Sequence, residues 1–381
     1  MIVINDITLR EGEQSAGVNF FPEEKLRIAE QLVKMRVPII EASFAAASEA
    51  DLIATKMIAS RFGTRDGPVI CSMARANKKD IEIAAEAVSP AAKGRIQVVL
   101  STSDIHIKYQ LGKTRTEIRD MAYEMVRYAR TLSDDVEFAA MDATRSDPDF
   151  LIEVFKACIE AGAKTLEIPD TVGYATPSEY AAIVRAVVGS VPQEIVVATH
   201  CHDDVGLAVA NTLAGMVAGA RQLEVTVNGI GERAGNAALE EVVMAVRVRQ
   251  DYYQVDFGLD TTQIASISRL VAELADMPVA KNKAVVGRNA FLHESGIHQH
   301  GLLLNKETYQ ILEPGDIGLD RYELVLGKLS GKHALKQRLE ELGLRVLEDE
   351  FEAVYLSFKE LASKKKVITN EDIRSLCKKV R

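Results

Sequence analysis

Residues 149–171, DFLIEVFKACIEAGAKTLEIPDT, decide the fold because they contain one complete unit of a pattern that recurs along the chain. Asp149–Ala163 has the composition of a helix, and Gly162 can end it because glycine tolerates the left-handed conformation found at helix ends. Thr165–Ile168 is a short apolar run typical of a buried strand, and the polar Asp170 and Thr171 follow it directly. The stretch therefore predicts a helix, a buried strand and a polar strand end.

Seven similar runs lie along the first two-thirds of the chain, and most of them are nearly all apolar, as parallel strands covered on both faces should be. They are Ile2–Ile4, Pro38–Phe44, Pro68–Met73, Ile96–Leu100, Val136–Met141, Ile195–Thr199 and Leu223–Val227. Eight strands that alternate with helices within about 250 residues are typical of a (β/α)8 barrel. A doubly wound open sheet is the alternative.

Polar residues after the strands favour the barrel, because active sites of such barrels collect at the C-terminal ends of the strands. The residues in question are Asp6, Arg10, Glu11, Glu41, Ser43, Arg75, Asp142, Arg145, Asp170, Thr171, His200, His202 and those from Asn228 to Asn236. Beyond about residue 265 the alternation stops. Thr262–Ala275 has a helical pattern, Met277–Leu304 is irregular, and two helical stretches follow at roughly His333–Leu342 and Asp349–Lys364. We therefore predict an α/β TIM barrel over residues 1–265 and a smaller, mainly helical C-terminal region over residues 266–381.

Composition limits the classes of partner. Lys and Arg number 46 against 55 Asp and Glu, a net charge of −9, which argues against a nucleic-acid binder held by phosphate contacts. Apolar runs are shorter than a membrane span, and the start MIVINDITLREGEQ has no basic-then-apolar leader. The four scattered cysteines are best interpreted as reduced thiols. We expect a cytoplasmic protein that binds neither membrane nor nucleic acid.

His200-Cys201-His202 is the sharpest local motif. On a strand, residues i and i+2 point to the same face, so the two imidazoles project together and Cys201 points toward the helix layer. Two imidazoles at the end of a barrel strand suit a divalent metal, whereas the alternative is a pair of unrelated surface histidines.

Two further motifs flank this pair in the predicted barrel. Residues 6–14, DITLREGEQ, crowd Asp6, Arg10 and Glu11 at the end of the first strand, where such charges are costly unless they pair with each other, a metal or a substrate. A carboxylate beside two histidines would complete an O,N,N metal site. Residues 229–236, GIGERAGN, are a glycine-rich turn that does not match the dinucleotide-binding fingerprint but would let the backbone approach a ligand.

These motifs in this order resemble the metal-dependent acyl-CoA condensing enzymes with a TIM barrel, and most closely the 2-isopropylmalate synthases. Homocitrate and citramalate synthases are near relatives. The resemblance extends over nearly the whole chain, through PDTVG at 169–173, HCHDDVG at 200–206, HESGIHQ at 293–299 and GKLSG at 327–331. It implies an acyltransferase that condenses acetyl-CoA with a 2-oxo acid, most simply 2-oxoisovalerate to give 2-isopropylmalate for leucine biosynthesis.

The resemblance also implies the roles of site residues. The metal ligands would be Glu11, His200 and His202, with Asn236 as a weaker fourth, and the ion would be Mn2+, Zn2+ or Mg2+. Arg10 would neutralise developing oxyanion charge, and Thr171 would hold the carboxylate of the oxo acid. Arg75 and His106 would lie along the same pocket. His298 and Tyr309 match positions linked to activation of acetyl-CoA, and would reach over the barrel mouth of a neighbouring subunit in a homodimer.

Several positions depart from the family pattern. Ala139 and Met141 stand where Ser and Glu are usual, Glu167 stands where isopropylmalate synthases tend to have Asn, and His300 replaces a common Asp. Met141 and Glu167 would reshape the pocket, and Glu167 would repel a second substrate carboxylate. These departures favour a monocarboxylic oxo acid.

Three alternatives stay open from the sequence. They are a condensing enzyme of the homocitrate or citramalate type, an aldolase or lyase on the same barrel, and a metal-binding paralogue without catalysis. Full-length isopropylmalate synthases usually continue into a leucine-binding regulatory domain, whereas this sequence stops at Arg381. We therefore expect one of two cases: a protein that lacks the leucine-binding regulatory domain and its feedback inhibition by leucine, or a sequence that is a piece of a longer protein.

Overall fold

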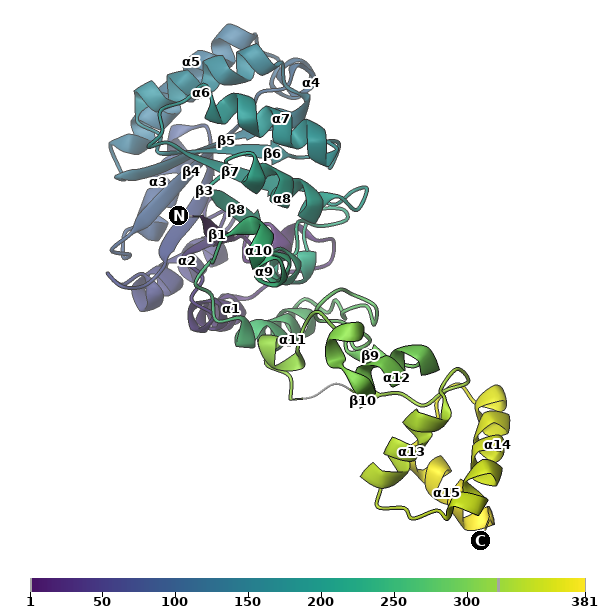
Figure 1. The fold of residues 1–381 in the computed structure, drawn as a ribbon. Helices are drawn as coiled ribbons and strands as arrows, with labels where there is room; N and C mark the ends of the chain where they lie inside the picture. The colour runs from purple at the N-terminus through teal and green to yellow at the C-terminus, as the bar shows by residue number, and fades with distance from the viewer. Residues whose placement is uncertain (1, 321–322, 381) are drawn as a thin grey trace. The chain divides into compact units, whose positions relative to one another are not determined.

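The structure, a computed structural model, describes residues 2–320 and 323–380 and divides the chain into two compact units, Met1–Val279 and Ala280–Arg381. The first unit contains a closed barrel of eight parallel strands in sequential order, surrounded by helices (Figure 1). The strands are β1 (Val3–Asp6), β2 (Ile39–Ser43), β3 (Val69–Arg75), β4 (Gly94–Ser101), β5 (Asp135–Met141), β6 (Thr165–Asp170), β7 (Val196–Cys201) and β8 (Gln222–Val225). The predicted TIM barrel is confirmed.

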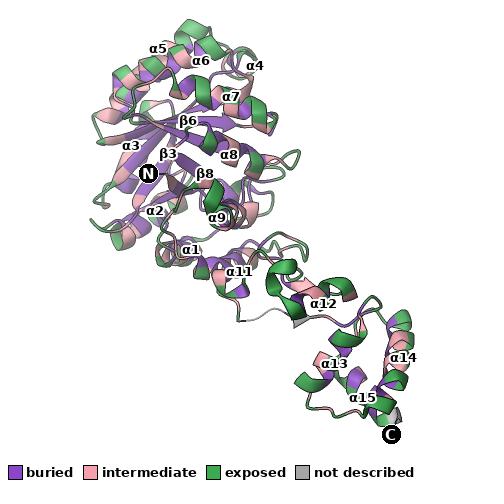
Figure 2. Cartoon of the chain, viewed as in Figure 1, coloured by how far each residue is buried: buried purple, intermediate pink, exposed green. Residues whose placement is uncertain are grey.

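Helices connect the strands and cover the outside of the barrel. They are α1 (Pro22–Lys34), α2 (Glu49–Phe62), α3 (Lys78–Val88), α4 (Asp104–His106), α5 (Arg115–Arg130), α6 (Pro148–Ala161), α7 (Pro177–Val188), α8 (Ala208–Val217), α9 (Leu239–Val248), α10 (Gln250–Tyr253) and α11 (Ile264–Leu274). α6 ends where Gly162 adopts a left-handed conformation with φ 105°, as the sequence predicts. Figure 2 shows the strands almost entirely buried and the outer faces of the helices exposed.

The register of the strands places the polar residues at one end of the barrel. Parallel pairing matches Asp6 with Val225, Pro169 with His200 and Asp170 with Cys201. Short 3-10 turns follow several strands at this end, including Gly12–Gln14, Ala143–Arg145 and Val227–Gly229. The side chains that the sequence singles out for chemistry therefore surround the carboxyl ends of the strands.

The second unit is mainly helical. It contains a two-stranded sheet of β9 (Leu292–His293) and β10 (Glu323–Leu324), and the helices α12 (Gly296–Leu304), α13 (Lys332–Glu341), α14 (Glu348–Lys364) and α15 (Asn370–Val380). α13, α14 and α15 enclose their own apolar core, which includes Leu335, Val354, Phe358 and Ile373. The sequence pattern treats residues 277–304 as irregular, whereas the structure forms α12 there, and α15 is a helix that the pattern does not predict.

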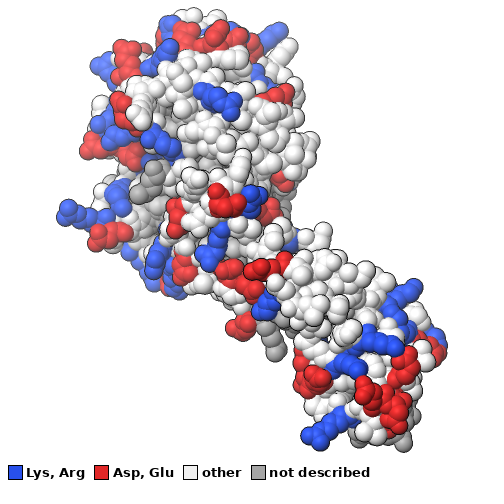
Figure 3. All heavy atoms as spheres, in the orientation of Figure 1, with Lys and Arg blue, Asp and Glu red and all other residues white. Residues whose placement is uncertain are grey.

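Charged side chains of both signs are interspersed over the face shown in Figure 3. Among the described residues no helix is both long and apolar enough to cross a membrane.

Candidate metal centre at the mouth of the barrel

A cavity of about 490 Å3 opens at the C-terminal ends of the strands. Most of the site residues predicted in the first unit lie along its wall. These are Arg10, Glu11, Arg75, Met141, Glu167, Thr171, His200 and His202. The barrel thus brings together residues that are up to 192 positions apart in the sequence, from Arg10 to His202.

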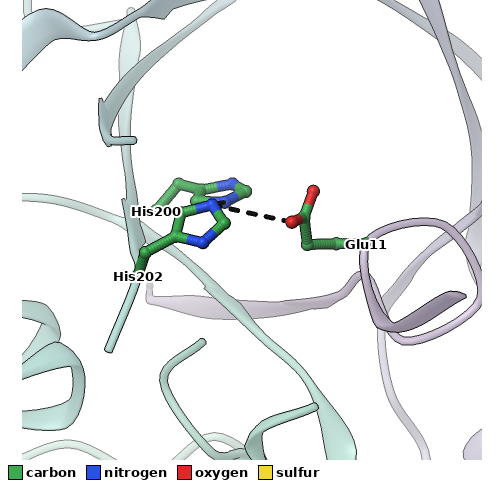
Figure 4. Close-up of side chains that lie close together, drawn as sticks. All are labelled: Glu11, His200 and His202. Atoms are coloured by element: carbon green, nitrogen blue, oxygen red, sulfur yellow. Dashed lines mark hydrogen bonds and ion pairs between the residues drawn. The ribbon is translucent and has the colours of Figure 1, made fainter. Parts of the chain in front are cut away.

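Glu11, His200 and His202 converge on one point at this mouth (Figure 4). The Nε2 atoms of the two imidazoles lie 3.2 Å apart, and Nε2 of His202 lies 3.6 Å from Oε1 of Glu11. One ligand atom from each residue lies within 4.8 Å of the others, and all three side chains are buried. This arrangement places one carboxylate oxygen and two ring nitrogens around a single position, as the sequence predicts for a divalent cation.

Two carboxylates contact the other ring nitrogen of His200, Nδ1. Nδ1 lies 3.0 Å from Oε1 of Glu167 and 3.0 Å from Oε2 of Glu224. Burial opposes the charged imidazole, but these two carboxylates outweigh it and raise the pKa of His200 well above its ordinary value. Both carboxylates face Nδ1 and accept its hydrogen, and Nε2 is directed at the candidate metal position.

His202 is in the opposite electrostatic situation. Burial and, after it, the neighbouring His200 lower the pKa of His202 to about 3. Its ring is therefore neutral at physiological pH, so its Nε2, which lies 3.2 Å from Nε2 of His200, can act as an acceptor or a metal ligand. For Glu11, burial favours the protonated acid, but Arg10 and the two imidazoles outweigh burial and keep the pKa below its ordinary value. The carboxylate is thus ionised, as a metal ligand must be.

Asn236 stands beside His202, to which it is joined by an isolated antiparallel bridge. Its Nδ2 donates to the carbonyl of Ile230 at 3.3 Å, and its buried Oδ1 has no hydrogen-bond partner among the described residues. Gly231 makes room for this amide, because a Cβ at that position would lie 2.1 Å from Nδ2. The glycine-rich turn therefore presents one unpaired oxygen next to the two histidines.

The donor set fits a divalent metal ion. A carboxylate and two imidazoles with an unpaired amide oxygen close by suit Zn2+ or Mn2+ well, and Mg2+ less well because it prefers oxygen ligands. Burying the unpaired Oδ1 of Asn236 costs free energy unless a donor or a cation binds to it. One cation could bind this oxygen together with the Nε2 atoms of His200 and His202.

Arg10 is fixed beside the cavity by a buried ion pair. Its Nε and Nη2 donate to the two carboxylate oxygens of Glu41 at 2.9 and 3.1 Å, and Nη1 contacts Glu11. Glu41 is fully buried, and burial raises its pKa to about 7 although Arg10 opposes the rise. The bidentate pair orients the guanidinium and leaves further N–H groups of Arg10 available to a ligand.

Thr171 and Arg75 lie on the rim of the cavity and differ in their hydrogen bonds. The backbone N–H of Asp142 donates to Oγ1 of Thr171 at 2.8 Å, so the Thr171 hydroxyl retains its own hydrogen for a ligand. Arg75 is largely exposed, and its Nε donates to Oδ2 of Asp80 at 2.6 Å.

His106 lies outside the lining of the cavity. Its Nε2 is 3.8 Å from Oδ2 of Asp142, and Asp142 is held by Arg145 and by the hydroxyl of Ser103. The structure therefore groups His106 with this acidic residue rather than with the histidine pair.

His298 and Tyr309 lie in the second unit, where their rings stack with centroids 4.2 Å apart. His298 is on α12, and Tyr309 follows the short turn Lys306–Thr308. Tyr309 is 43% exposed, so its ring is not part of a buried core.

Glu224 is the functional neighbour that the sequence analysis did not identify. It is fully buried on β8, and Nδ2 of Asn5 donates to its Oε1 at 3.0 Å. The available signal was the alternation of Gln222 and Glu224 within an otherwise apolar strand, which places both polar side chains on the inward face.

Comparisons with known families and proteins agree with this architecture. The HMGL-like family profile matches residues 1–271, and the homocitrate synthase post-HMGL domain-like profile matches residues 285–366. A 2-isopropylmalate synthase of Nostoc sp. is 52% identical over 98% of this chain and 73% of its own length. Proteins of the same name from Synechocystis sp. and Gloeobacter violaceus are 51% and 50% identical, with 98% of this chain covered in each case and 73% and 72% of their own lengths.

Solved structures share the barrel at lower identity. An HMG-CoA lyase of Bacillus subtilis superposes with a TM-score of 0.64 at 20% identity, covering 76% of this chain and 96% of its own. An HMG-CoA lyase from Acinetobacter baumannii, solved with coenzyme A and 3-methylmalate, gives a TM-score of 0.64 at 20% identity over 77% of this chain and 97% of its own. At this identity the likeness concerns the fold alone.

Proposed function

This chain belongs to the HMGL-like family and, within it, to the 2-isopropylmalate synthases, and from that premise we propose that it condenses acetyl-CoA with 2-oxoisovalerate to give 2-isopropylmalate. The protein is then an acyltransferase that converts the acyl group into an alkyl group on transfer, and it serves leucine biosynthesis. The convergence of Glu11, His200 and His202 in the cavity is the observation that carries the proposal.

The proposed reaction forms one carbon–carbon bond and hydrolyses one thioester. A base removes a proton from the methyl group of acetyl-CoA, and the methyl carbon forms a bond to the carbonyl carbon of the oxo acid. The carbonyl oxygen takes up a proton to become the hydroxyl group. Water then cleaves the thioester, which releases the CoA thiol and leaves a second carboxylate on the product.

The residues of the barrel mouth have distinct parts in this proposal. A divalent cation held by Glu11, His200, His202 and Asn236 would polarise the carbonyl of the oxo acid. Arg10, oriented by Glu41, donates its remaining N–H groups to the oxygen on which negative charge develops. Thr171 donates its free hydroxyl hydrogen to the carboxylate of the oxo acid.

Other assignments concern the rest of the chain. We assign Arg75 to the rim of the substrate site, and Met141 and Glu167 to its inner wall. We also assign His106 to substrate binding, although it lies beside Asp142 and outside the lining of the cavity. His298 and Tyr309 form a stacked pair that we assign to activation of acetyl-CoA, with the barrel of residues 1–265 and the region of residues 266–381 acting across two subunits of a homodimer. We place the enzyme in the cytoplasm.

Identification of the product tests this function. The metal-loaded protein, incubated with acetyl-CoA and 2-oxoisovalerate, should form a compound with the mass and chromatographic retention of authentic 2-isopropylmalate. CoA release without that product would mean hydrolysis of acetyl-CoA and would contradict the proposal.

A further inference from the structure

Arg233 lies in the glycine-rich turn of residues 229–236 that follows β8, and its side chain lines the cavity. Its φ of 56° falls in the left-handed region, where a residue with a Cβ is under strain. Contacts of the side chain can offset this strain, and the guanidinium of Arg233 makes contacts with two other loops of the barrel mouth.

The guanidinium joins its own turn to the ends of the two preceding strands. Nε of Arg233 lies 2.7 Å from Oδ1 of Asp204, and Nη2 lies 2.8 Å from Oδ2, so the ion pair is bidentate. Nη2 also donates to the backbone carbonyl of Thr171 at 2.7 Å. Because Thr171 follows β6 and Asp204 follows β7, one side chain links the loops after three consecutive strands.

These loops also pack closely against one another. A Cβ on Gly173 would lie 2.6 Å from Oδ2 of Asp204 and 2.8 Å from its backbone nitrogen, so a larger residue at that position would push the two loops apart. The N–H of Asp203 donates to the carbonyl of Gly235 at 2.9 Å, which joins the loops after β7 and β8. The loop that bears Thr171 therefore lies directly against Asp204.

Thr171 is held at two of its own atoms. Its Oγ1 accepts the backbone N–H of Asp142 at 2.8 Å, which leaves the hydroxyl hydrogen for a ligand, and its carbonyl oxygen accepts Nη2 of Arg233. A group that binds substrate has to be held within about 0.5 Å of the productive geometry. The bond from Arg233 fixes the main chain on which the Thr171 hydroxyl depends for its position.

Stability alone gives little reason for this ion pair. The side chains of Arg233 and Asp204 are 38% and 25% exposed, and ion pairs that water can reach contribute little to folding. Removing the guanidinium should therefore leave the protein folded, and its effect should be found at the cavity.

We propose that Arg233 is a positioning residue of the substrate site, which holds the main chain of Thr171 and thereby sets the Thr171 hydroxyl against the carboxylate of the oxo acid. The inference rests on the proposed function, since it uses the carboxylate that Thr171 is assigned to bind. It adds a residue that acts on the affinity for the oxo acid through another residue.

The experiment uses the full chain loaded with Mn2+ and measures release of the CoA thiol. Arg233→Met keeps an unbranched side chain and removes every N–H group. We expect KM for 2-oxoisovalerate to rise by about 10-fold, because a hydrogen bond to a charged group loses its alignment. We expect kcat and KM for acetyl-CoA to change by less than about 3-fold, since the loss concerns binding of the oxo acid. Metal content and melting temperature should be retained.

Arg221→Met is the matched control. Nη2 of Arg221 also donates to backbone carbonyls, those of Gln193 and Ile195 at 2.7 and 2.6 Å, but Arg221 directly precedes β8 and therefore lies at the other end of the barrel. This variant should leave both KM values unchanged. Arg233→Lys keeps the charge and can reach one acceptor, so it should restore part of the affinity for 2-oxoisovalerate.

A double-mutant cycle shows whether Arg233 acts through Thr171. Thr171→Val removes the hydroxyl and keeps the shape of the side chain, and it should itself raise KM for 2-oxoisovalerate. In the Thr171→Val background, Arg233→Met should raise this KM by less than about 2-fold further, because the group that it positions is already absent. If Arg233→Met does not fold, Arg233→Lys is compared in the same two backgrounds.

The outcomes separate the two proposals. Unchanged KM for 2-oxoisovalerate in Arg233→Met or in Thr171→Val would overturn this inference, and so would an equal rise in both KM values. A full additive effect in the double variant would also overturn it. Each of these results leaves the proposed function standing, whereas absence of thiol release by the unaltered protein would overturn the proposed function itself.

Discussion

The Nε2 atoms of His200 and His202 lie 3.2 Å apart at the mouth of the barrel, closer than two neutral acceptor nitrogens would approach without a shared proton or cation. Two carboxylates hold the Nδ1 atom of His200, so its ring cannot turn away. The two Nε2 atoms therefore meet at the candidate metal position, and a first prediction concerns this pair.

His202→Ala should remove divalent metal binding and activity while the fold is retained. The substitution deletes one of the two ring nitrogens at the metal position, and we expect metal affinity to fall by at least about 100-fold. Metal content after dialysis, measured by inductively coupled plasma mass spectrometry, and the circular dichroism spectrum are the readouts. His333→Ala, an exposed histidine of α13, is the control. Retained activity in His202→Ala would remove the histidine pair from the mechanism.

Arg10→Lys tests the guanidinium. Lysine keeps the positive charge but cannot form the bidentate pair with Glu41 or aim several N–H groups at the substrate. We expect kcat to fall by about 100- to 1,000-fold, with metal content unchanged. Arg119→Lys, in a surface ion pair with Glu153, should behave like the unaltered protein. A decrease in kcat of less than about 5-fold would show that Arg10 only neutralises Glu41.

Lys25 should be important for stability although it is outside the cavity. Its side chain is 1% exposed, and Nζ lies 2.6 Å from Oε2 of Glu13 and 2.6 Å from Oδ1 of Asp51. Lys25→Met leaves both carboxylates without their cation and should lower the free energy of unfolding by about 3–5 kcal/mol in urea titrations. Lys56→Met breaks an exposed pair with Glu86 of the same 2.6 Å length and should cost less than about 1 kcal/mol. Equal effects of the two variants would contradict this account.

The thiols of the barrel should be unreactive in the native protein. Cys71, Cys158 and Cys201 are buried, and burial is the main cause that raises their thiol pKa values, to about 12 for Cys201. Thiolate, the reactive form, is therefore scarce at pH 8. Titration with Ellman's reagent should leave these three cysteines unmodified until the protein is denatured, as mass mapping of the labelled peptides would show. Rapid labelling of Cys201 in the native state would contradict its position against the helix layer.

The sequence predicts the barrel because apolar runs and polar strand ends are local features. The boundaries differ slightly where a polar residue extends a strand, as in β1, which continues to the buried Asp6. The sequence does not predict α12, because the apolar residues of 296–304, GIHQHGLLL, do not recur with the periodicity of an amphipathic helix. Its helical conformation depends on contacts outside the segment, such as the Gln299 amide donating to the carbonyls of His293 and Val325.

The site residues also divide into those that a local sequence motif reveals and those that only the closed barrel brings together. The histidine pair is visible in the sequence because two residues on one strand suffice to define it. The hydrogen bonds between Arg10 and Glu41 join the turn after β1 to β2, and the contact between His200 and Glu224 joins β7 to β8. Only the closed barrel brings these residues together. The alternation of Gln222 and Glu224 indicates that the Glu224 carboxylate points into the barrel, but a single sequence contains no signal for its contact with His200.

The measurement that tests the central claim most directly is release of the CoA thiol from acetyl-CoA and 2-oxoisovalerate, with and without a chelator. The account predicts thiol release in step with formation of 2-isopropylmalate, complete loss of both after treatment with EDTA, and recovery when Mn2+ or Zn2+ is restored. Undiminished thiol release in the protein shown to be free of metal would contradict it.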